Sequence, residues 1–192
     1  GDSSIYGALV WLSQPWNMRY PLISFHGNNG SRAGDEAAAY RYTECKLSKM
    51  GEEMLADIKK DTVDWQLAYT DVEDEPVYLP GRIPNLIVNG TSGSAVAMAC
   101  SFAPHNLNEV MDAAIHVTQN PNCDIKEILN YISGPDFPTG GLIINKDELP
   151  AAYLTGKGRA RIRGEYHIES DKRGDTIVFT SIPYKVSKED LV

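Results

Sequence analysis

Apolar residues recur at helical spacing at the start of the chain and again further along its first third. The opening stretch "GDSSIYGALVWL" predicts a helix with Asp2 or Ser3 as N-cap and one apolar face formed by Ile5, Leu9 and Leu12. The clearest helical pattern covers residues 43–60, where Leu47, Met50, Met54, Leu55 and Ile58 recur among lysines and glutamates. Both segments are therefore predicted to be amphipathic helices.

Capping signals predict further helices in the second half of the chain. Asn106 and Asp124 each precede a helical pattern, and a glutamate follows each of them three residues later. This spacing is the sequence signature of a capping box. Another helix is expected at about 147–155.

Short apolar runs bounded by Gly, Asn and Pro predict strands. They lie near 22–25, at 85–90 ("NLIVNG") and at 141–145 ("GLIIN"), and two longer runs around the turn "DKRGD" predict a hairpin. Residues 69–83 are acidic, contain prolines and are interpreted as a boundary between subdomains. Because helices and strands mix without strict alternation, the predicted fold class is α+β.

The net charge of −8 would by itself argue against a nucleic-acid partner. The charge is segregated, however, since "DVEDEP" holds only acids and "KGRARIR" holds only bases among its charged residues. The bases of the second stretch have period two and are expected on one face of a strand: Lys157, Arg159, Arg161 and Arg163. They either face solvent or follow a row of phosphates. The average charge therefore neither favours nor excludes a nucleic-acid partner.

No stretch approaches the run of about 18 apolar residues that a transmembrane helix needs, and no signal-peptide pattern opens the chain. A cytoplasmic protein without membrane contact is predicted. Cys45, Cys100 and Cys123 lie far apart and are interpreted as buried or free thiols rather than disulfides or zinc ligands. The histidines have no metal-ligand spacing, so no metal site is expected.

The stretch "AAAYRYTECKL" carries the main candidate chemistry. Arg41 lies between Tyr40 and Tyr42, directly before the predicted helix start at Thr43. A guanidinium can favour a phenolate or neutralise a phosphate, and a helix N-terminus suits an anionic oxygen. The pattern fits a nucleophile for phosphoryl transfer. The alternative is that both tyrosines are half-buried packing residues with hydroxyls in water. Nearby, "GNNGS" is either a phosphate-cradling loop or a plain tight turn.

Several stretches occur in the order and spacing found in the A subunits of bacterial type IIA topoisomerases: "GDSSIY", "QPWNMRY", "GNNGS…GD…AAAYRYTE", "IPNLIVNGTSGSAVAMA", "PHNLNEV" and "GPDFPTGG". The chain resembles the gyrase A and topoisomerase IV A subunits along essentially its whole length, most closely over 1–141. The resemblance fits the two kinds of protein equally.

In this family the tyrosine of R-Y-T-E attacks a DNA phosphodiester and becomes linked to the 5′ end of the broken strand. The resemblance thus implies that Tyr42 is the nucleophile and that Arg41 stabilises the charge of the transition state. Tyr40 occupies a position that is usually apolar, and it is assigned to packing.

The resemblance also implies contacts with DNA and with drugs. The DNA-binding positions are Arg19, Asn89, Ser92 and Ser94, and Ser94 replaces a bulky aliphatic residue that wedges between base pairs. Ser3 and Gly7 occupy the two quinolone-anchoring positions, of which the second is usually acidic.

The fold implied by the resemblance is a winged-helix (CAP-like) breakage-reunion domain over 1–75, followed by the beginning of a tower domain over 76–192. The chain would be an excised fragment that folds but is inactive in strand passage. Mg²⁺ and ATP would be held by the partner B subunit, with no cofactor in this chain. The implied partners are double-stranded DNA, the B subunit of the enzyme and a second full-length copy of the A subunit.

A second hypothesis is a non-catalytic DNA-binding or inhibitor-docking module on the same fold. The intact R-Y-T-E sequence favours the enzyme. The loss of a frequent basic residue at Trp11 and of the wedge at Ser94 favours the module.

Overall fold

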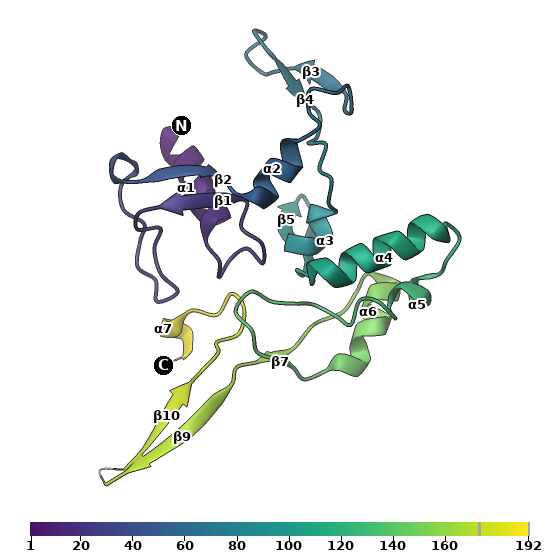
Figure 1. Cartoon of the computed structure of the whole chain (residues 1–192). Helices are drawn as coiled ribbons and strands as arrows, with labels where there is room; N and C mark the ends of the chain where they lie inside the picture. Colours follow the sequence, from purple (N-terminus) through teal and green to yellow (C-terminus); the bar gives the residue numbers. More distant parts are fainter. Residues whose placement is uncertain (173, 192) are drawn as a thin grey trace.

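The structure is a computed structural model that describes residues 1–172 and 174–191. Short helices and hairpins alternate along the chain without forming one large sheet (Figure 1). In the described residues, the strands pair into separate two-stranded antiparallel sheets. This arrangement confirms the predicted α+β class.

In the first part of the chain, helix α1 (Asp2–Ser13) packs against strand β1 (Ile23–His26), which pairs with strand β2 (Glu44–Leu47). The two strands are antiparallel, with Ile23 opposite Leu47 and His26 opposite Glu44. The predicted first helix and first strand are therefore confirmed. The predicted cap is wrong, because Gly1 is the N-cap and no side chain caps α1.

The helix predicted over 43–60 is much shorter in the structure. Residues Tyr40–Tyr42 form a 3-10 turn (η1), strand β2 follows, and only Lys49–Leu55 form helix α2. The Ser48 hydroxyl caps α2 by accepting the Gly51 N–H at 3.1 Å. The pattern misled because β1 needs a partner strand, and backbone pairing with β1 overrides the helical propensity of 44–47.

The buried strand predicted at 85–90 is instead helix α3 (Asn85–Asn89). Only part of its apolar run is buried, since Val88 is inaccessible whereas Leu86 and Ile87 are exposed. The side chains of Asn85 and Asn89 meet across one helical turn at 2.7 Å. Gly90 ends the helix at φ 68°, where a Cβ would lie 2.4 Å from the carbonyl oxygen of Phe102. A three-residue apolar run does not distinguish a short helix from a strand.

An excursion of the chain separates α2 from α3. It forms a small hairpin of β3 (Trp65–Leu67) and β4 (Asp74–Pro76), which projects from the molecule (Figure 1). Arg82 closes its base by donating from Nε and Nη2 to the two carboxylate oxygens of Asp57, at 2.8 and 3.0 Å. These hydrogen bonds hold the pKa of Asp57 well below its usual range.

The second half contains a group of packed helices: α4 (Leu107–Gln119), α5 (Ile125–Ile128) and α6 (Leu149–Thr155), the last preceded by the 3-10 turn η2 (Lys146–Glu148). The predicted capping box at Asp124 and Glu127 is confirmed. Asn106 caps α4 as predicted, but the carboxylate of Glu109 accepts from the Ser133 N–H. The buried apolar residues of the described chain lie mainly around α1, β1, α3, α4 and α6: Val10, Met18, Ile23, Val63, Val88, Val110, Ala113 and Leu149.

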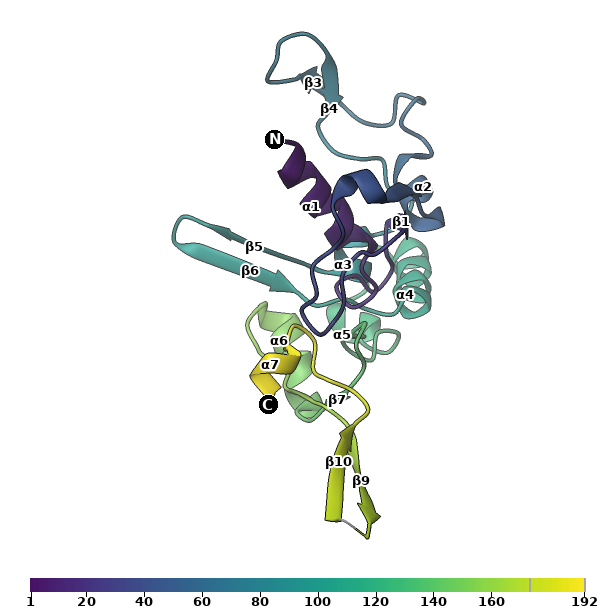
Figure 2. The ribbon, with the colours of Figure 1, turned by 90° about the vertical axis from the view of Figure 1, so that its left-hand side faces the viewer.

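Two further hairpins project from this body. The first is β5 (Thr91–Ala95) with β6 (Met98–Phe102), which Figure 2 shows in profile. The second is the predicted C-terminal hairpin, formed by β9 (Tyr166–Asp171) and β10 (Gly174–Phe179); Arg173 of its turn lies outside the described residues. The last described element is α7 (Lys188–Leu191).

The predicted basic strand is confirmed in part. Strand β8 comprises only Ile162–Arg163 and pairs with β7 (Leu142–Ile143), the strand predicted at 141–145. Arg159, Arg161 and Arg163 are nevertheless exposed, and the residues between them are half-buried. Lys157 follows the end of α6 at Gly156 and belongs to no strand. Arg159, Arg161 and Arg163 therefore alternate in exposure with their neighbours as expected, but of the four predicted bases only Arg163 lies in a strand.

Candidate active site

The proposed nucleophile lies on an exposed turn. Tyr42 is the last residue of η1, its N–H donates to the carbonyl oxygen of Ala39 at 2.9 Å, and 68% of the residue is exposed. The guanidinium carbon of Arg41 lies 4.6 Å from the centroid of the Tyr42 ring. Cation–π contact at this distance keeps a positive charge beside the phenol. The turn thus presents a phenol and a guanidinium together to solvent.

One part of the sequence argument for Tyr42 is wrong. The N-terminus of α2 was expected directly after Tyr42, but α2 begins at Lys49 and strand β2 lies between them. The orphan N–H groups and dipole of a helix terminus act only within its first turn. They therefore do not support an anion at Tyr42, and Arg41 is the cation beside it in the structure.

A residue that sequence reasoning missed holds this turn. The Tyr6 hydroxyl, from α1, lies 2.6 Å from the carbonyl oxygen of Ala38 and 3.0 Å from the hydroxyl of Thr43. The Tyr6 ring contacts Tyr40 edge-on at a centroid distance of 6.0 Å. Tyr40 is thus a packing partner of Tyr6 in the structure, although 60% of it is exposed. The sequence offers no signal for Tyr6 beyond its position on a predicted helix.

The loop between β1 and η1 uses its own N–H groups internally. The Gly30 N–H donates to the Asn28 side-chain oxygen at 2.9 Å, and the Ser31 N–H to the Asp35 carbonyl oxygen at 3.2 Å. The side-chain amide of Gln14, the C-cap of α1, anchors the loop by donating to the carbonyl oxygen of Asn29 at 2.6 Å. These contacts favour the tight turn over a phosphate cradle for "GNNGS". Gly27 (φ 116°) lets the loop pass close to the backbone of Thr43.

Ser3 and Gly7, the predicted drug-contacting positions, lie one helical turn apart on α1, and both are exposed. A Cβ added at Gly7 would meet no atom of the described residues within 4 Å. A larger side chain therefore fits at this position without displacing its neighbours.

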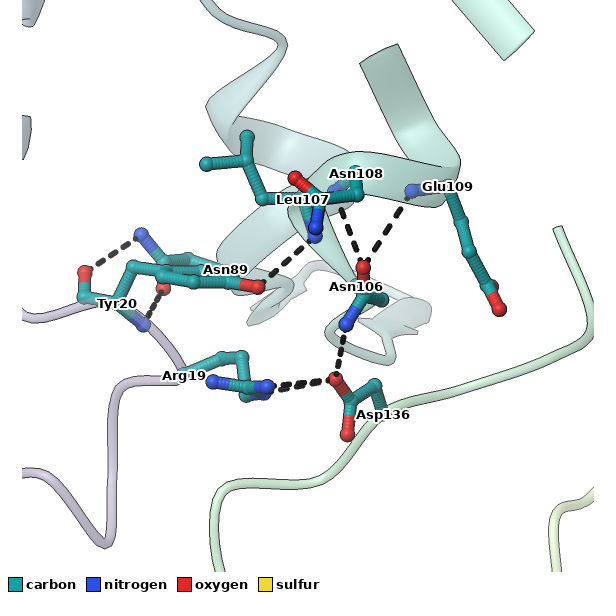
Figure 3. A network of polar contacts seen from close by, with 8 residues as sticks. All are labelled: Arg19, Tyr20, Asn89, Asn106, Leu107, Asn108, Glu109 and Asp136. Carbon is teal, nitrogen blue, oxygen red and sulfur yellow. Dashed lines mark hydrogen bonds and ion pairs between the residues drawn. The ribbon is translucent and has the colours of Figure 1, made fainter. Parts of the chain in front are cut away.

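Two of the residues predicted to contact DNA make hydrogen bonds to other parts of this chain (Figure 3). Arg19 pairs with Asp136 through Nε at 2.9 Å and Nη2 at 2.8 Å. Asn89 is buried, and its amide accepts from the Tyr20 N–H and donates to the Tyr20 carbonyl oxygen and to Asn85. Both donor hydrogens of Asn89 are therefore used, which leaves none for a phosphate. In this structure the two residues join the segment before β1 to α3 and to the loop around Asp136.

The other two predicted DNA contacts lie on the projecting hairpin. Ser92 and Ser94 belong to β5, are exposed and pair with Ser101 and Ala99 of β6. The Lys185 amine lies 3.5 Å from the Ser92 hydroxyl. Val96, at the hairpin tip, is 97% exposed. The hairpin thus presents short side chains along its strand and an aliphatic side chain at its end.

A small basic pocket was also missed by sequence reasoning. Its volume is about 210 Å³, and its lining includes Arg32, Lys185, Ser31, Asn17 and Thr139 but no carboxylate. The Thr139 hydroxyl is buried and has no hydrogen-bond partner among the described residues. Arg32 and Lys185 are distant in sequence, so no basic run marked the site.

Within residues 1–172 and 174–191, no group of three or more His, Cys, Asp and Glu side chains could hold a metal ion. Cys45 and Cys100 are free and exposed, and Cys123 is free and half-buried. None of the helices in the described part of the chain has the length and apolarity that crossing a membrane requires.

The sequence profile that describes the A subunits of DNA gyrase and topoisomerase IV matches residues 1–192. The chain belongs to this family. It is 52% identical over 195 residues to the DNA gyrase A subunit of Aminobacterium colombiense and 47% identical over 192 residues to that of Helicobacter pylori. It is 49% identical over 193 residues to the DNA topoisomerase 4 A subunit of Bacillus subtilis.

These alignments cover 100% of this chain and 23% to 24% of the relatives. The chain therefore spans about a quarter of the length of the curated relatives it matches. Its identity to the topoisomerase 4 relative lies between the identities to the two gyrase relatives, so these values do not separate gyrase from topoisomerase IV.

Proposed function

We propose that this chain supplies the DNA-cleaving tyrosine of a bacterial type IIA topoisomerase. The observation that carries the proposal is the exposed Tyr42 phenol on η1, with the guanidinium carbon of Arg41 4.6 Å from its ring centroid. Family membership supports it, because the R-Y-T-E sequence of that family is intact here.

The proposed reaction is a reversible phosphoryl transfer. The Tyr42 phenol oxygen attacks a backbone phosphorus and loses its proton to solvent, while the bond from phosphorus to the 3′ oxygen breaks and that oxygen takes up a proton. The 5′ end of the strand becomes linked to Tyr42. Arg41 offsets the negative charge that develops on the phosphoryl oxygens. Because a phenolate is a tolerable leaving group, attack by the 3′ hydroxyl reseals the strand.

Double-stranded DNA is the proposed substrate. Exposed Arg159, Arg161 and Arg163, together with the pocket of Arg32 and Lys185, provide positive charge on a chain whose net charge is −8. Contacts of this type give affinity that falls with salt concentration. The β5–β6 hairpin, with Ser92 and Ser94, is proposed to approach the same duplex.

The rest of the machinery is proposed to lie outside these residues. A partner B subunit would hold Mg²⁺ and ATP, and a second full-length copy of the chain would complete the homodimer that cleaves both strands. The winged-helix domain over 1–75 and the incomplete tower domain over 76–192 are proposed on the same basis. By itself the chain would fold and bind DNA without strand passage, and a cytoplasmic location would suit this substrate.

Substitution of the two tyrosines tests the proposal. In the full-length protein with its B subunit, Tyr42→Phe should lower covalent linkage to end-labelled DNA by on the order of a thousandfold or more, because only the attacking oxygen is lost. DNA affinity should stay near that of the parent. Tyr40→Phe is the matched control and should retain most linkage, because its ring contact with Tyr6 persists.

The same experiment separates the two functional hypotheses. Linkage by the parent that disappears in Tyr42→Phe supports the enzyme. DNA binding without linkage in the parent would instead support the non-catalytic module. If linkage is lost in Tyr40→Phe but kept in Tyr42→Phe, the nucleophile is Tyr40 and the proposed assignment is wrong.

A further inference from the structure

The Tyr6 hydroxyl touches both ends of the turn that carries Tyr42, although Tyr6 lies on another element. On one side of the turn it meets the carbonyl oxygen of Ala38 at 2.6 Å. On the other side it meets the hydroxyl of Thr43 at 3.0 Å. Ala39, Tyr40, Arg41 and Tyr42 lie in between, and the last three of them form η1. A single phenol on α1 therefore contacts the chain both before and after η1.

The number of protons on these groups decides which group donates and which accepts in each contact. The Ala38 carbonyl can only accept, so the Tyr6 proton goes to it. The Thr43 hydroxyl also lies 3.2 Å from the carbonyl oxygen of Tyr40, and its one proton is shared between that oxygen and the oxygen of Tyr6. The hydroxyls and carbonyls thus form one connected chain across the turn. Removing the phenol oxygen removes the contact with Ala38 and the contact with Thr43.

The Tyr6 ring adds a second constraint. It lies edge-on to Tyr40 at 6.0 Å and is tilted against Phe25 of β1 at 6.5 Å. Tyr6 is half-buried, so water does not readily replace its hydrogen bonds. The ring keeps α1 against β1, whereas the hydroxyl acts on the turn.

We propose that Tyr6 is a positioning residue for the Tyr42 nucleophile, acting through Ala38 and Thr43 rather than by touching DNA. This inference depends on the proposed function, because it concerns the same cleavage step. Attack at phosphorus requires the phenol oxygen to be held near its line of approach, and small losses of alignment cost rate. Tyr6 restrains the backbone before η1 at Ala38 and the side chain of Thr43 after it, and it leaves the Tyr42 side chain free to meet the phosphate.

The test uses a labelled duplex under single-turnover conditions, with the full-length protein bound to its B subunit. Tyr6→Phe keeps the ring and removes the oxygen. It should slow covalent linkage by about tenfold while DNA affinity stays unchanged. Thr43→Val should slow linkage similarly, and Thr43→Ser, which restores the hydroxyl, should recover the parent rate.

Tyr153→Phe is the matched control for lost stability. Its hydroxyl also makes a short hydrogen bond, 2.6 Å to the His105 ring, but on α6 and far along the chain from η1. It should lower the melting temperature without slowing linkage. Equal slowing of linkage in Tyr153→Phe and Tyr6→Phe would overturn the positioning role, as would a loss of DNA affinity that accounts for the whole effect of Tyr6→Phe.

A duplex with sulfur in place of the scissile 3′ oxygen gives an independent readout. Its thiolate leaves without protonation, so a defect in positioning the nucleophile should persist. If the defect of Tyr6→Phe disappears with sulfur, Tyr6 assists the leaving group and the proposal is wrong. The proposed function has a separate test. If covalent linkage survives Tyr42→Phe, the proposed function is wrong, whatever the result for Tyr6→Phe.

Discussion

The local structure does not explain why residue 7 is a glycine. It lies inside α1, where a glycine costs about 1 kcal/mol relative to alanine, and nothing lies within 4 Å of where its Cβ would be. It needs neither a close approach nor a positive φ. Its neighbour one turn earlier, Ser3, is exposed on the same side of α1. Any requirement for glycine at this position therefore has to come from outside the described fold.

Substitution of Gly7 tests the drug pocket implied by the family resemblance. That resemblance implies that a serine and an acidic residue one turn apart would form the quinolone anchor, and here only Ser3 is present. Gly7→Glu should increase quinolone-stabilised cleavage by the full-length enzyme, measured on supercoiled plasmid. Gly7→Ala controls for helix stability: it should raise the free energy of unfolding by about 1 kcal/mol and leave drug sensitivity as in the parent. Equal drug-stabilised cleavage in all three proteins would reject the anchor.

The β5–β6 hairpin is the element whose shape bears most directly on the proposed contact with DNA. Ser94 lies within β5 opposite Ala99, and the chain turns after Ala95, with Ala97 at φ 63°. Val96 at this turn is 97% exposed, so the aliphatic side chain lies at the tip and not at position 94. A wedge that unstacks a base step needs an apolar side chain that can enter the stack. Serine is short and polar, and Val96, two residues further along, carries an exposed aliphatic side chain.

DNA bending by the full-length protein tests this interpretation. Ser94→Ile should increase the bend angle, measured by fluorescence transfer between the ends of a labelled duplex, because it restores an aliphatic wedge. Val96→Ser should decrease the angle. Ala95→Ile is the control, since the adjacent residue points to the opposite face of the hairpin. Bend angles that do not change in Ser94→Ile and Val96→Ser would show that neither residue enters the stack.

Distant parts of the chain are joined by buried polar contacts rather than by a large apolar core. His105 is buried, with one ring nitrogen 3.0 Å from the carbonyl oxygen of Ile87 and the other 2.6 Å from the Tyr153 hydroxyl. Since a carbonyl only accepts, the first nitrogen carries the proton and the second accepts from Tyr153. Burial lowers the pKa of His105 and raises the pKa of Tyr153 to about 12. A neutral histidine therefore joins α3 to α6.

This arrangement predicts how stability depends on pH. The pKa of His105 is lower in the folded than in the unfolded chain, so below about pH 6.5 the unfolded chain binds a proton that the folded chain does not. Glu109 and Asp136 oppose the shift but do not reverse it. The melting temperature should fall as the pH is lowered from about 7.5 to about 5.5. In His105→Gln it should start lower and change less with pH, as measured by calorimetry. His26→Gln, at an exposed position, should follow the parent profile.

Short-range signals in the sequence predicted α4 and α5 from their caps and the C-terminal hairpin from its turn, because a cap or a turn is made by residues close together in the chain. Local patterns also predicted α1, from its apolar spacing, and α6. They also determined the family and the candidate Tyr42 with Arg41 beside it. Only the tertiary structure decided that residues 44–47 pair with β1 and that 85–89 form a helix. It alone brought Tyr6 to Ala38 and Thr43, and Arg19 to Asp136. These contacts join residues 32 to 117 positions apart, and a pattern of local spacing carries no information about which distant group satisfies a buried hydrogen bond.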